Sequence, residues 1–223
     1  MNVSTIHCSA DVTEFIEKED VKGFLARDEA EKLFELALTQ SKSAPCLELG
    51  SYCGLSTVYM GLAVRLNSGT LYAVDHHRGS EEHQLGEDYH DPDLIDPRDG
   101  CFNSFWHFRK TLQNAKLEDT VVPIVCKSEL AVRDWSTPLS MVFIDGGHSE
   151  AMAVADCLNW SGKLSPGGLI AIHDIFENPG DGGQGPYIAM QTLLQTGEFE
   201  PYDRVNSLAI LRKREAKTPD SSR

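Results

Sequence analysis

Short apolar segments, each followed at once by a glycine or a polar residue, alternate along this chain with stretches of helical periodicity. The segments and the residues that follow them are 46–49 with Gly50, 71–74 with Asp75, 141–144 with Asp145, and 169–172 with His173. Apolar strands of this length that alternate with helices are typical of a parallel sheet buried on both faces. The pattern therefore predicts an α/β fold, in which a doubly wound, mainly parallel sheet carries helices on both faces.

Helical periodicity, with apolar residues three or four positions apart, recurs between these strands. It predicts helices over residues 28–41, 55–66, 104–115, 149–163 and 187–196. Asp28 and Glu31 have the spacing of a capping box at the start of the first of these helices. Two further strands are predicted at 121–125, where Pro123 favours a sheet edge or a bulge, and at 208–211.

The domain organisation follows from length and from the stretches without periodicity. Residues 1–212 are predicted to form one domain, and the charged residues 213–223 are expected to be a disordered tail. Residues 76–103 are rich in acids and histidines and lack apolar periodicity. We expect this segment to be a lid-like insertion, because long irregular stretches inside compact domains are usually functional.

The chain is strongly acidic, with 34 Asp plus Glu against 20 Lys plus Arg and a net charge of −14. Such a surface repels nucleic acids and anionic membranes, and no apolar run reaches the roughly 18 residues of a membrane span. Residues 1–20 carry no secretory signal, and the six cysteines include no CxxC pair. We therefore expect a cytoplasmic protein with a small-molecule partner, and the composition leaves a homodimer open.

Residues 48–56, Glu-Leu-Gly-Ser-Tyr-Cys-Gly-Leu-Ser, connect a strand to a helix through two glycines. Gly50 and Gly54 permit a tight turn and let a ligand approach the amides at the start of the helix. The spacing differs from the G-x-G-x-x-G of nicotinamide- and flavin-binding folds. Asp75, at the end of the next strand, is placed to accept hydrogen bonds from a ribose diol. The structural alternative is a strand capped by glycines next to an acidic loop.

Together these residues resemble the class I S-adenosylmethionine-dependent methyltransferases, over roughly residues 45–211. The resemblance implies a seven-stranded Rossmann-like fold with S-adenosyl-L-methionine as the cofactor. It implies that Asp75 binds the ribose and that Ser128 contacts the adenine. The residues that it places on the methionine side are Glu48, Gly50, Ser51, Gly54 and Ser56.

Acidic residues and histidines follow two strands that we expect to be neighbours in the sheet. Because neighbouring strands lie about 4.8 Å apart, Asp145 and Asp174 can converge on one ion with His173 in reach. We predict that these three residues hold Mg²⁺ or Mn²⁺, provided that the strand ends before His173. Asp145 is also expected to contact the cofactor and to take part in catalysis. His148 is the predicted general base, and its alternative role is to cap helix 149–163.

The segments 144–148, 164–168 and 173–174 narrow the resemblance to small bacterial methyltransferases that include metal-dependent sugar O-methyltransferases. That branch carries Asp or Glu where this chain has His173, and a nitrogen ligand extends the choice to manganese and other transition metals. The implied reaction is methyl transfer to a hydroxyl of a small acceptor, a sugar or glycoside. A catechol or phenol acceptor is the alternative within the class. A metal-dependent hydrolase and a non-catalytic nucleoside-binding module are the alternatives outside it.

Overall fold

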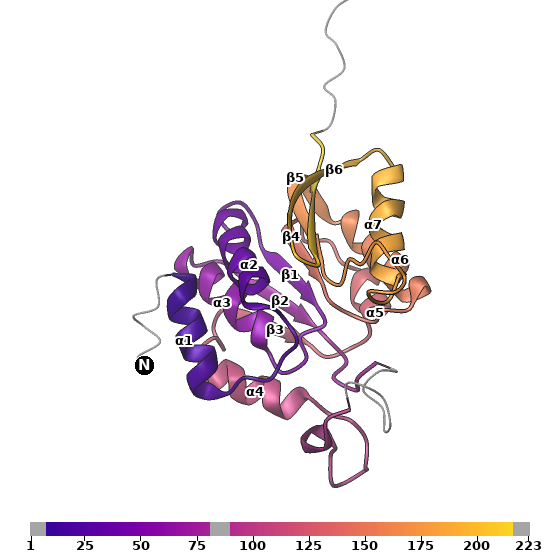
Figure 1. Cartoon of the computed structure of the whole chain (residues 1–223). Coiled ribbons are helices and arrows are strands. Elements are labelled where there is room, and N and C mark those ends of the chain that lie inside the picture. The colour runs from indigo at the N-terminus through magenta and orange to yellow at the C-terminus, as the bar shows by residue number, and fades with distance from the viewer. Residues whose placement is uncertain (1–7, 81–89, 216–223) are drawn as a thin grey trace, which may run out of the picture.

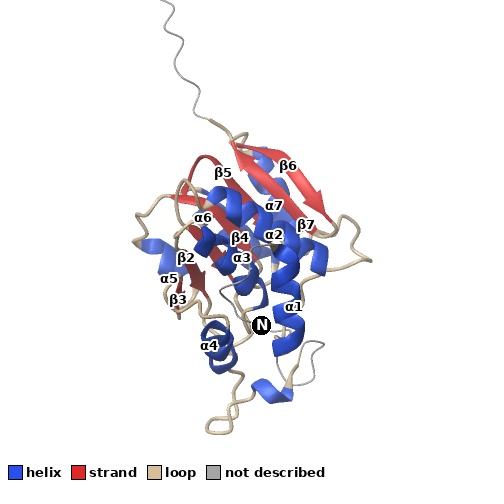
Figure 2. Ribbon diagram, turned by 90° about the vertical axis from the view of Figure 1, so that its left-hand side faces the viewer, coloured by secondary structure: helices blue, strands red, loops and turns tan. Residues whose placement is uncertain are grey.

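The computed structural model describes residues 8–80 and 90–215, which form a seven-stranded sheet flanked by helices (Figures 1 and 2). The strand order is β3-β2-β1-β4-β5-β7-β6. Neighbours from β3 to β5 are parallel, whereas β7 is antiparallel to both β5 and β6. The strands are β1 Cys46–Leu49, β2 Leu71–Val74, β3 Val121–Ile124, β4 Leu139–Ile144, β5 Leu164–Ile172, β6 Phe199–Val205 and β7 Leu208–Lys213. The predicted doubly wound, mainly parallel sheet is confirmed, and Pro123 lies in an edge strand as expected.

Helices cover both faces of the sheet, and each face has its own apolar core. The first core joins the sheet to α1 Ser9–Glu19, α2 Arg27–Gln40, α3 Leu55–Leu66 and α4 Phe105–Asn114. The second joins it to α5 Ser128–Arg133, α6 Glu150–Ser161 and α7 Gly185–Gln195. Chain order reverses between β1 and β4, and open α/β sheets bind ligands beyond the carboxyl ends of the strands at such a point.

The alternation of side chains along each strand determines which face a polar residue meets. In β1, Leu47 and Leu49 belong to the second core, so Glu48 points to the first face, where it reaches α3. In β5, Ile172 belongs to the second core, so the next residue, His173, points toward α2. This alternation buries two ionisable side chains on the first face of the sheet, next to its ligand-binding edge.

Among the described residues, four elements were not predicted from the sequence, namely α1, α5, β6 and the short 3-10 helix η3, Pro92–Leu94. Helix α1 buries Val12, Phe15 and Ile16, whereas most of β6 is exposed and is held by pairing with β7. The predicted capping box is also wrong. Helix α2 begins at Arg27, and it is Glu29 that accepts a hydrogen bond from the backbone N–H of Ala26 (3.3 Å), while Glu31 pairs with Arg27.

The described parts of the insertion predicted over 76–103 are anchored to the domain, while its residues 81–89 lie outside the described residues. Lys22 forms ion pairs with Asp91 (2.6 Å) and Asp93 (2.9 Å) beside the short 3-10 helix η3, Pro92–Leu94. At the other end of this stretch, Phe102 packs with Leu94 in a small apolar cluster. Of the tail predicted over 213–223, Lys213 is the last residue of β7, and 216–223 lie outside the described residues. No helix among the described residues has the length and apolar character needed to cross a bilayer.

Candidate active site

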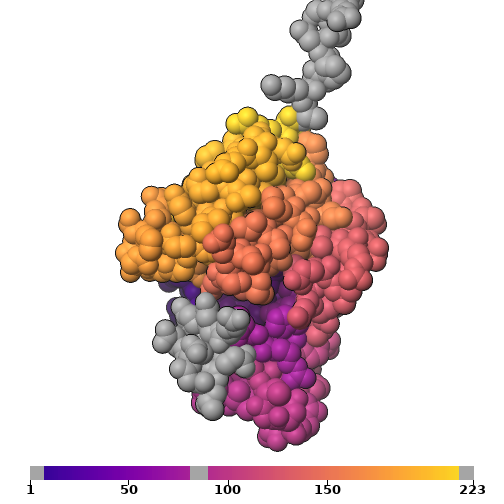
Figure 3. All heavy atoms as spheres, turned by 90° about the vertical axis from the view of Figure 1, so that its right-hand side faces the viewer, coloured from indigo at the N-terminus to yellow at the C-terminus, as the bar shows by residue number. Residues whose placement is uncertain are grey.

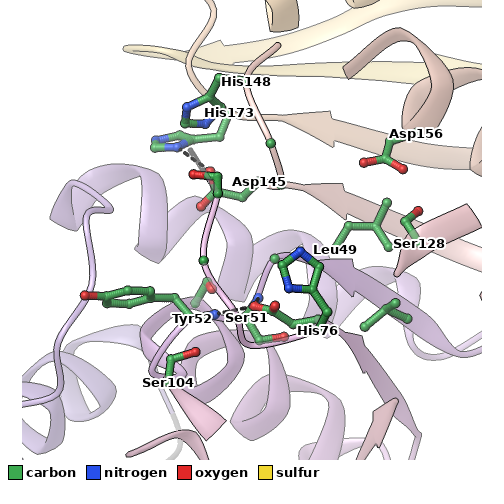
Figure 4. Close-up of a pocket in the computed structure, with 18 of the residues that line it drawn as sticks. Leu49, Ser51, Tyr52, His76, Ser104, Ser128, Asp145, His148, Asp156 and His173 are labelled. Carbon is green, nitrogen blue, oxygen red and sulfur yellow. Dashed lines mark hydrogen bonds and ion pairs between the residues drawn. The ribbon is translucent and has the colours of Figure 1, made fainter. Parts of the chain in front are cut away.

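A cavity of about 570 Å³ opens at the carboxyl ends of β1, β2, β4 and β5, where the sequence placed its polar residues. Its walls also include residues 22–25, which precede α2, and His76, Gly79 and Ser80 after β2. Figure 3 shows a face on which the early part of the chain, in purple, meets the later part, in orange. Figure 4 shows the side chains that point into the cavity from these elements. A cavity of this volume is in the range that holds a small-molecule ligand.

The glycine turn after β1 forms one wall of the cavity. Gly50 has φ +82°, and a Cβ on it would lie 2.0 Å from the carbonyl oxygen of Asp145, so only glycine fits between the two loops. Gly54, with φ +97°, precedes the first turn of α3. Ser51 and Ser56, which were predicted on the methionine side of the cofactor, line the cavity.

Glu48 lies behind the glycine turn and not in the cavity wall. Its carboxylate is fully buried and accepts hydrogen bonds from the hydroxyls of Ser56 (2.5 Å) and Thr57 (2.6 Å). Burial raises the pKa of Glu48 to about 7, and the hydrogen bonds from the hydroxyls only partly oppose this. Glu48 therefore supports the turn from beneath, where a direct contact with the ligand was expected.

Asp75, which was predicted to bind a ribose, lines the cavity beside the turn. One carboxylate oxygen accepts hydrogen bonds from the backbone N–H groups of Ser51 and Tyr52, both at 2.9 Å, and the other accepts one from His77 N–H at 2.7 Å. A carboxylate offers about four acceptor positions, so about one is left for a ligand. The contacts also hold the β1 and β2 loops together.

The far end of the cavity contains Ser128, at the start of α5, and Asp156, from α6. The indole N–H of Trp160 donates to the Ser128 hydroxyl at 2.8 Å. Asp156 was not predicted as a site residue, although it occupies the buried stripe of α6 together with Ala153, Cys157 and Trp160. An acid in an apolar stripe is the sequence signal that identifies it. Burial raises the pKa of Asp156 to about 6.

Asp145, His148 and Asp174 lie together just after β4 and β5, at the part of the cavity that we call the reacting edge. Each of the three offers a ligand atom within 4.8 Å of the other two. His148 Nε2 lies 3.1 Å from Asp174 Oδ2. The N-cap residue of α6 is Ser149, so His148 does not occupy the cap position that was its alternative role. Asp174 has φ 57°, an unusual value that turns the chain after β5 and lets its carboxylate face His148.

His173, predicted as a metal ligand, lies outside this group of three. Its ring is buried between two carboxylates, with Nδ1 3.1 Å from Asp145 Oδ1 and Nε2 3.0 Å from Glu29 Oε2 (Figure 4 shows the contact with Asp145). Burial lowers the pKa of His173, but the charge of Asp145 and the hydrogen bonds with Asp145 and Glu29 outweigh it and raise the pKa to about 11. His173 is therefore an imidazolium that uses both N–H groups to hold acids in place.

Glu29, from α2, is the other site residue that the sequence did not indicate. Besides His173, it accepts hydrogen bonds from the hydroxyl and N–H of Ser207 (2.8 and 2.9 Å) and from the N–H of Leu208 (3.1 Å). Burial raises its pKa, but the bonds from His173 and Ser207 outweigh this and lower the pKa to about 2. No local pattern marks Glu29, because its partners are distant in sequence.

Comparisons with known proteins agree with this architecture. An O-methyltransferase from Bacillus cereus in complex with SAH has a TM-score of 0.61 at 13% identity, over 93% of this chain and 90% of that one. The O-methyltransferase TomG from Streptomyces achromogenes, in complex with SAM, has a TM-score of 0.59 at 14% identity, over 93% and 89%. A putative caffeoyl-CoA O-methyltransferase from Staphylococcus aureus has a TM-score of 0.64 at 13% identity, over 94% of each chain.

At these sequence identities the similar structures establish a shared fold only. The family is established by a match of the sequence to a family profile. The profile of a protein family described as "Methyltransferase domain" matches residues 47–175, which is more than half of the chain. The matched region begins in β1 and ends just after Asp174, so it includes the cavity walls described above except residues 22–25. The chain therefore belongs to this methyltransferase family, as its resemblance to the class I S-adenosylmethionine-dependent methyltransferases predicted.

Proposed function

We propose that the protein is an S-adenosylmethionine-dependent O-methyltransferase that moves a methyl group to a hydroxyl of a small acceptor, a sugar or glycoside. The observation that carries the proposal is the position of Asp145, His148 and Asp174 at one end of a cavity whose other walls are the glycine turn and Asp75. The family match and the structural similarity to O-methyltransferases support the reaction class.

The walls of the cavity suit the parts of the methyl donor. The glycine turn, with Ser51 and Ser56, would hold the methionine end, and the remaining acceptor position of Asp75 would take a ribose hydroxyl. Ser128 would lie against the adenine. In this arrangement Asp145, His148 and Asp174 would be the residues nearest to the transferred methyl group.

The donor set at the reacting edge fits a divalent metal. Asp145 and Asp174 would hold the ion, and two carboxylates beside an imidazole suit Mg²⁺ or Mn²⁺. When bound, such an ion lowers the pKa of an acceptor hydroxyl, which helps most with weakly acidic sugar hydroxyls. The imidazolium of His173 holds the carboxylate of Asp145 in place beside His148 and Asp174.

We assign the role of general base to His148. In the neutral tautomer whose Nε2–H donates to Asp174, Nδ1 is the atom that takes the hydroxyl proton. The same geometry would also suit His148 as a third ligand of the metal. The two roles differ in a measurable way: loss of a base lowers kcat alone, whereas loss of a ligand lowers the affinity for the metal.

The phenol acceptor remains the alternative within the class, and its more acidic hydroxyl needs less activation. The hydrolase alternative leaves the glycine turn and Asp75 without a task, and the family match speaks against it. A cytoplasmic location and a homodimer stay predictions.

Calorimetric titration with S-adenosylhomocysteine and a mass-spectrometric screen with isotopically labelled S-adenosylmethionine test the proposal together. We expect binding, labelling of saccharides more than phenols, suppression by chelator and recovery with Mg²⁺ or Mn²⁺. Asp174→Ala should abolish turnover and leave binding of S-adenosylhomocysteine nearly intact, while the exposed Asp134→Ala should change neither. Failure to bind S-adenosylhomocysteine would refute the proposal, and full activity in excess chelator would remove the metal from it.

A further inference from the structure

A buried carboxylate lines the cavity at the end away from the reacting edge. Asp156 is 7% exposed and lies on the buried face of α6, among apolar side chains. Neither the glycine turn nor the group of Asp145, His148 and Asp174 contacts it through any hydrogen bond that the structure records among the described residues. A buried carboxylate is costly unless donors surround it, so its presence in a ligand cavity needs a reason.

The hydrogen bonds around Asp156 have a fixed direction. An indole N–H can only donate, so the Ser128 hydroxyl accepts from Trp160 at 2.8 Å. The Ser128 proton is then available to Asp156, with which it forms a hydrogen bond. The chain runs from Trp160 through Ser128 to Asp156, and it supplies one donor to a group that can accept several.

The remaining side of the carboxylate faces the loop that follows β4. Asp156 Oδ2 lies 3.4 Å from the position that a Cβ on Gly146 would occupy, and Gly146 itself lines the cavity. Because Gly146 has no side chain, no Cβ occupies the space next to this carboxylate oxygen. Figure 4 shows Asp156 and Ser128 side by side at this end, apart from Asp145 and His148.

We propose that Asp156 accepts a hydrogen bond from the exocyclic amino group of the adenine and thereby selects adenine nucleosides over nucleosides with a 6-oxo purine. The proposal rests on the proposed function, because it requires the adenine end of the methyl donor to lie against Ser128. An ionised carboxylate is an acceptor only. It pairs with the amino group of adenine, whereas the carbonyl oxygen of hypoxanthine would meet it as a second acceptor.

The conservative variant Asp156→Asn makes an opposite prediction. The Ser128 hydroxyl accepts from Trp160 and therefore donates to the side chain at position 156. In Asp156→Asn it would donate to the Asn carbonyl oxygen, and the Asn NH₂ group would then point toward the cavity. That group donates, and it would pair with a 6-oxo purine in place of adenine. The substitution should therefore shift the preference of the site from adenine toward a 6-oxo purine without altering the shape of the cavity.

The test compares S-adenosyl-L-homocysteine with S-inosyl-L-homocysteine by calorimetric titration of the full chain. For the wild type we expect the adenosyl compound to bind at least about tenfold tighter, because a polar site rejects a ligand that leaves its groups unpaired. For Asp156→Asn we expect that ratio to fall at least about tenfold, toward or past equality. The matched control is Glu150→Gln, an exposed glutamate on the same helix, which should keep the wild-type ratio.

The outcomes separate this inference from the function on which it rests. If the wild type binds the adenosyl compound but shows no preference, or if Asp156→Asn keeps the wild-type ratio, the inference is overturned and the proposed function stands. If the wild type binds neither compound, both are overturned. Should Asp156→Asn fail to fold, Asp156→Ser removes the carboxylate with a smaller side chain, and the same loss of preference is expected.

Discussion

Two buried acids form hydrogen bonds with residues that line the cavity. Glu48 supports the glycine turn from beneath, and Glu29 holds His173, which in turn holds Asp145. Glu48, Glu29 and His173 are almost fully buried, and each forms hydrogen bonds to groups from other elements. Substitutions at these positions should therefore change stability as well as the site.

The pKa of Glu48 predicts how stability depends on pH. Because burial raises the pKa to about 7, the folded state keeps a proton between roughly pH 4.5 and 7 that the unfolded state has released. Stability from this group is therefore present at low pH and lost as the pH rises through 7. Glu48→Gln removes this loss, since Gln can still accept from one hydroxyl and donate to the other.

We expect the unfolding free energy of Glu48→Gln minus that of the wild type to increase between pH 5 and pH 8, by up to roughly 3 kcal/mol. Urea unfolding at the two pH values measures the change. The exposed Glu35→Gln should keep a constant difference from the wild type across this range. An equal gap at both pH values for Glu48→Gln would show that Glu48 is ionised at pH 5.

Gly50 gives a second prediction at the scale of single residues. Gly50→Ala combines an unfavourable φ with a clash of its Cβ against the Asp145 backbone at 2.0 Å. Gly100 has φ +69° and open space around the same position, so Gly100→Ala carries the backbone penalty alone. We expect Gly50→Ala to cost at least about 2 kcal/mol more than Gly100→Ala in urea unfolding and to weaken binding of S-adenosylhomocysteine. Equal costs would mean that the two loops separate easily.

A site residue can be predicted from the sequence when its position depends on the residues next to it in the chain. Asp75, Asp145 and Asp174 follow apolar strands directly, and the rule for open α/β sheets places them at the ligand-binding edge. The role of His173 depends on the alternation along β5 and on Glu29 in α2, 144 positions away in sequence. Because Glu29 is so distant in sequence, its contact with His173 could not be predicted. The adjacent positions of His173 and Asp174 therefore led to the prediction that both residues bind a metal.

At the scale of elements, α2 is connected to β5 and to the β6–β7 turn through one carboxylate. Glu29 accepts hydrogen bonds from His173, Ser207 and Leu208, so it fixes three segments at once. Glu29→Gln would weaken the bond to the His173 imidazolium, which then would hold Asp145 less firmly. Glu29 is a positioning residue, since it reaches the site only through His173.

We expect Glu29→Gln to lower kcat by at least about tenfold with little change in the affinity for S-adenosylhomocysteine, and to lower the unfolding free energy by roughly 1–3 kcal/mol. Steady-state kinetics, calorimetry and urea unfolding measure the three quantities. Glu31→Gln on the same helix, whose partner Arg27 is exposed, is the matched control and should leave kcat unchanged. A loss of stability with unchanged kcat would assign Glu29 a purely structural role.

The elements themselves were predictable where burial is periodic. The apolar residues of β1, β2 and α3 are buried almost without exception, and the predicted bounds of these three elements match the structure. Strand β6 is exposed along most of its length, and α5 contains no fully buried residue. Such elements form because a neighbour pairs with or covers them, and the local sequence carries little sign of it.

At the scale of the whole molecule, the net charge of −14 acts on any ligand that carries charge. The cavity adds to this field locally, because the acids that line it outnumber the cations: Asp75, Glu129, Asp145, Asp156 and Asp174 against Lys22, Lys127 and the His173 imidazolium. S-adenosylmethionine carries one positive charge more than S-adenosylhomocysteine, on its sulfonium. An acidic cavity in an acidic protein therefore favours the methyl donor over the product, and salt should weaken this preference.

We expect the ratio of the dissociation constants of S-adenosylhomocysteine and S-adenosylmethionine to fall as NaCl is raised from about 10 mM to about 1 M, over which the Debye length shrinks from about 30 Å to about 3 Å. Calorimetric titrations in chelator, with the acceptor absent, measure the ratio. The contacts to the shared nucleoside and methionine parts cancel in it, so the change reports the field on the sulfonium alone. A cationic analogue that replaces the methylsulfonium with an ammonium should follow S-adenosylmethionine. A ratio that does not change with salt would show that contacts inside the cavity, and not the charge of the molecule, distinguish donor from product.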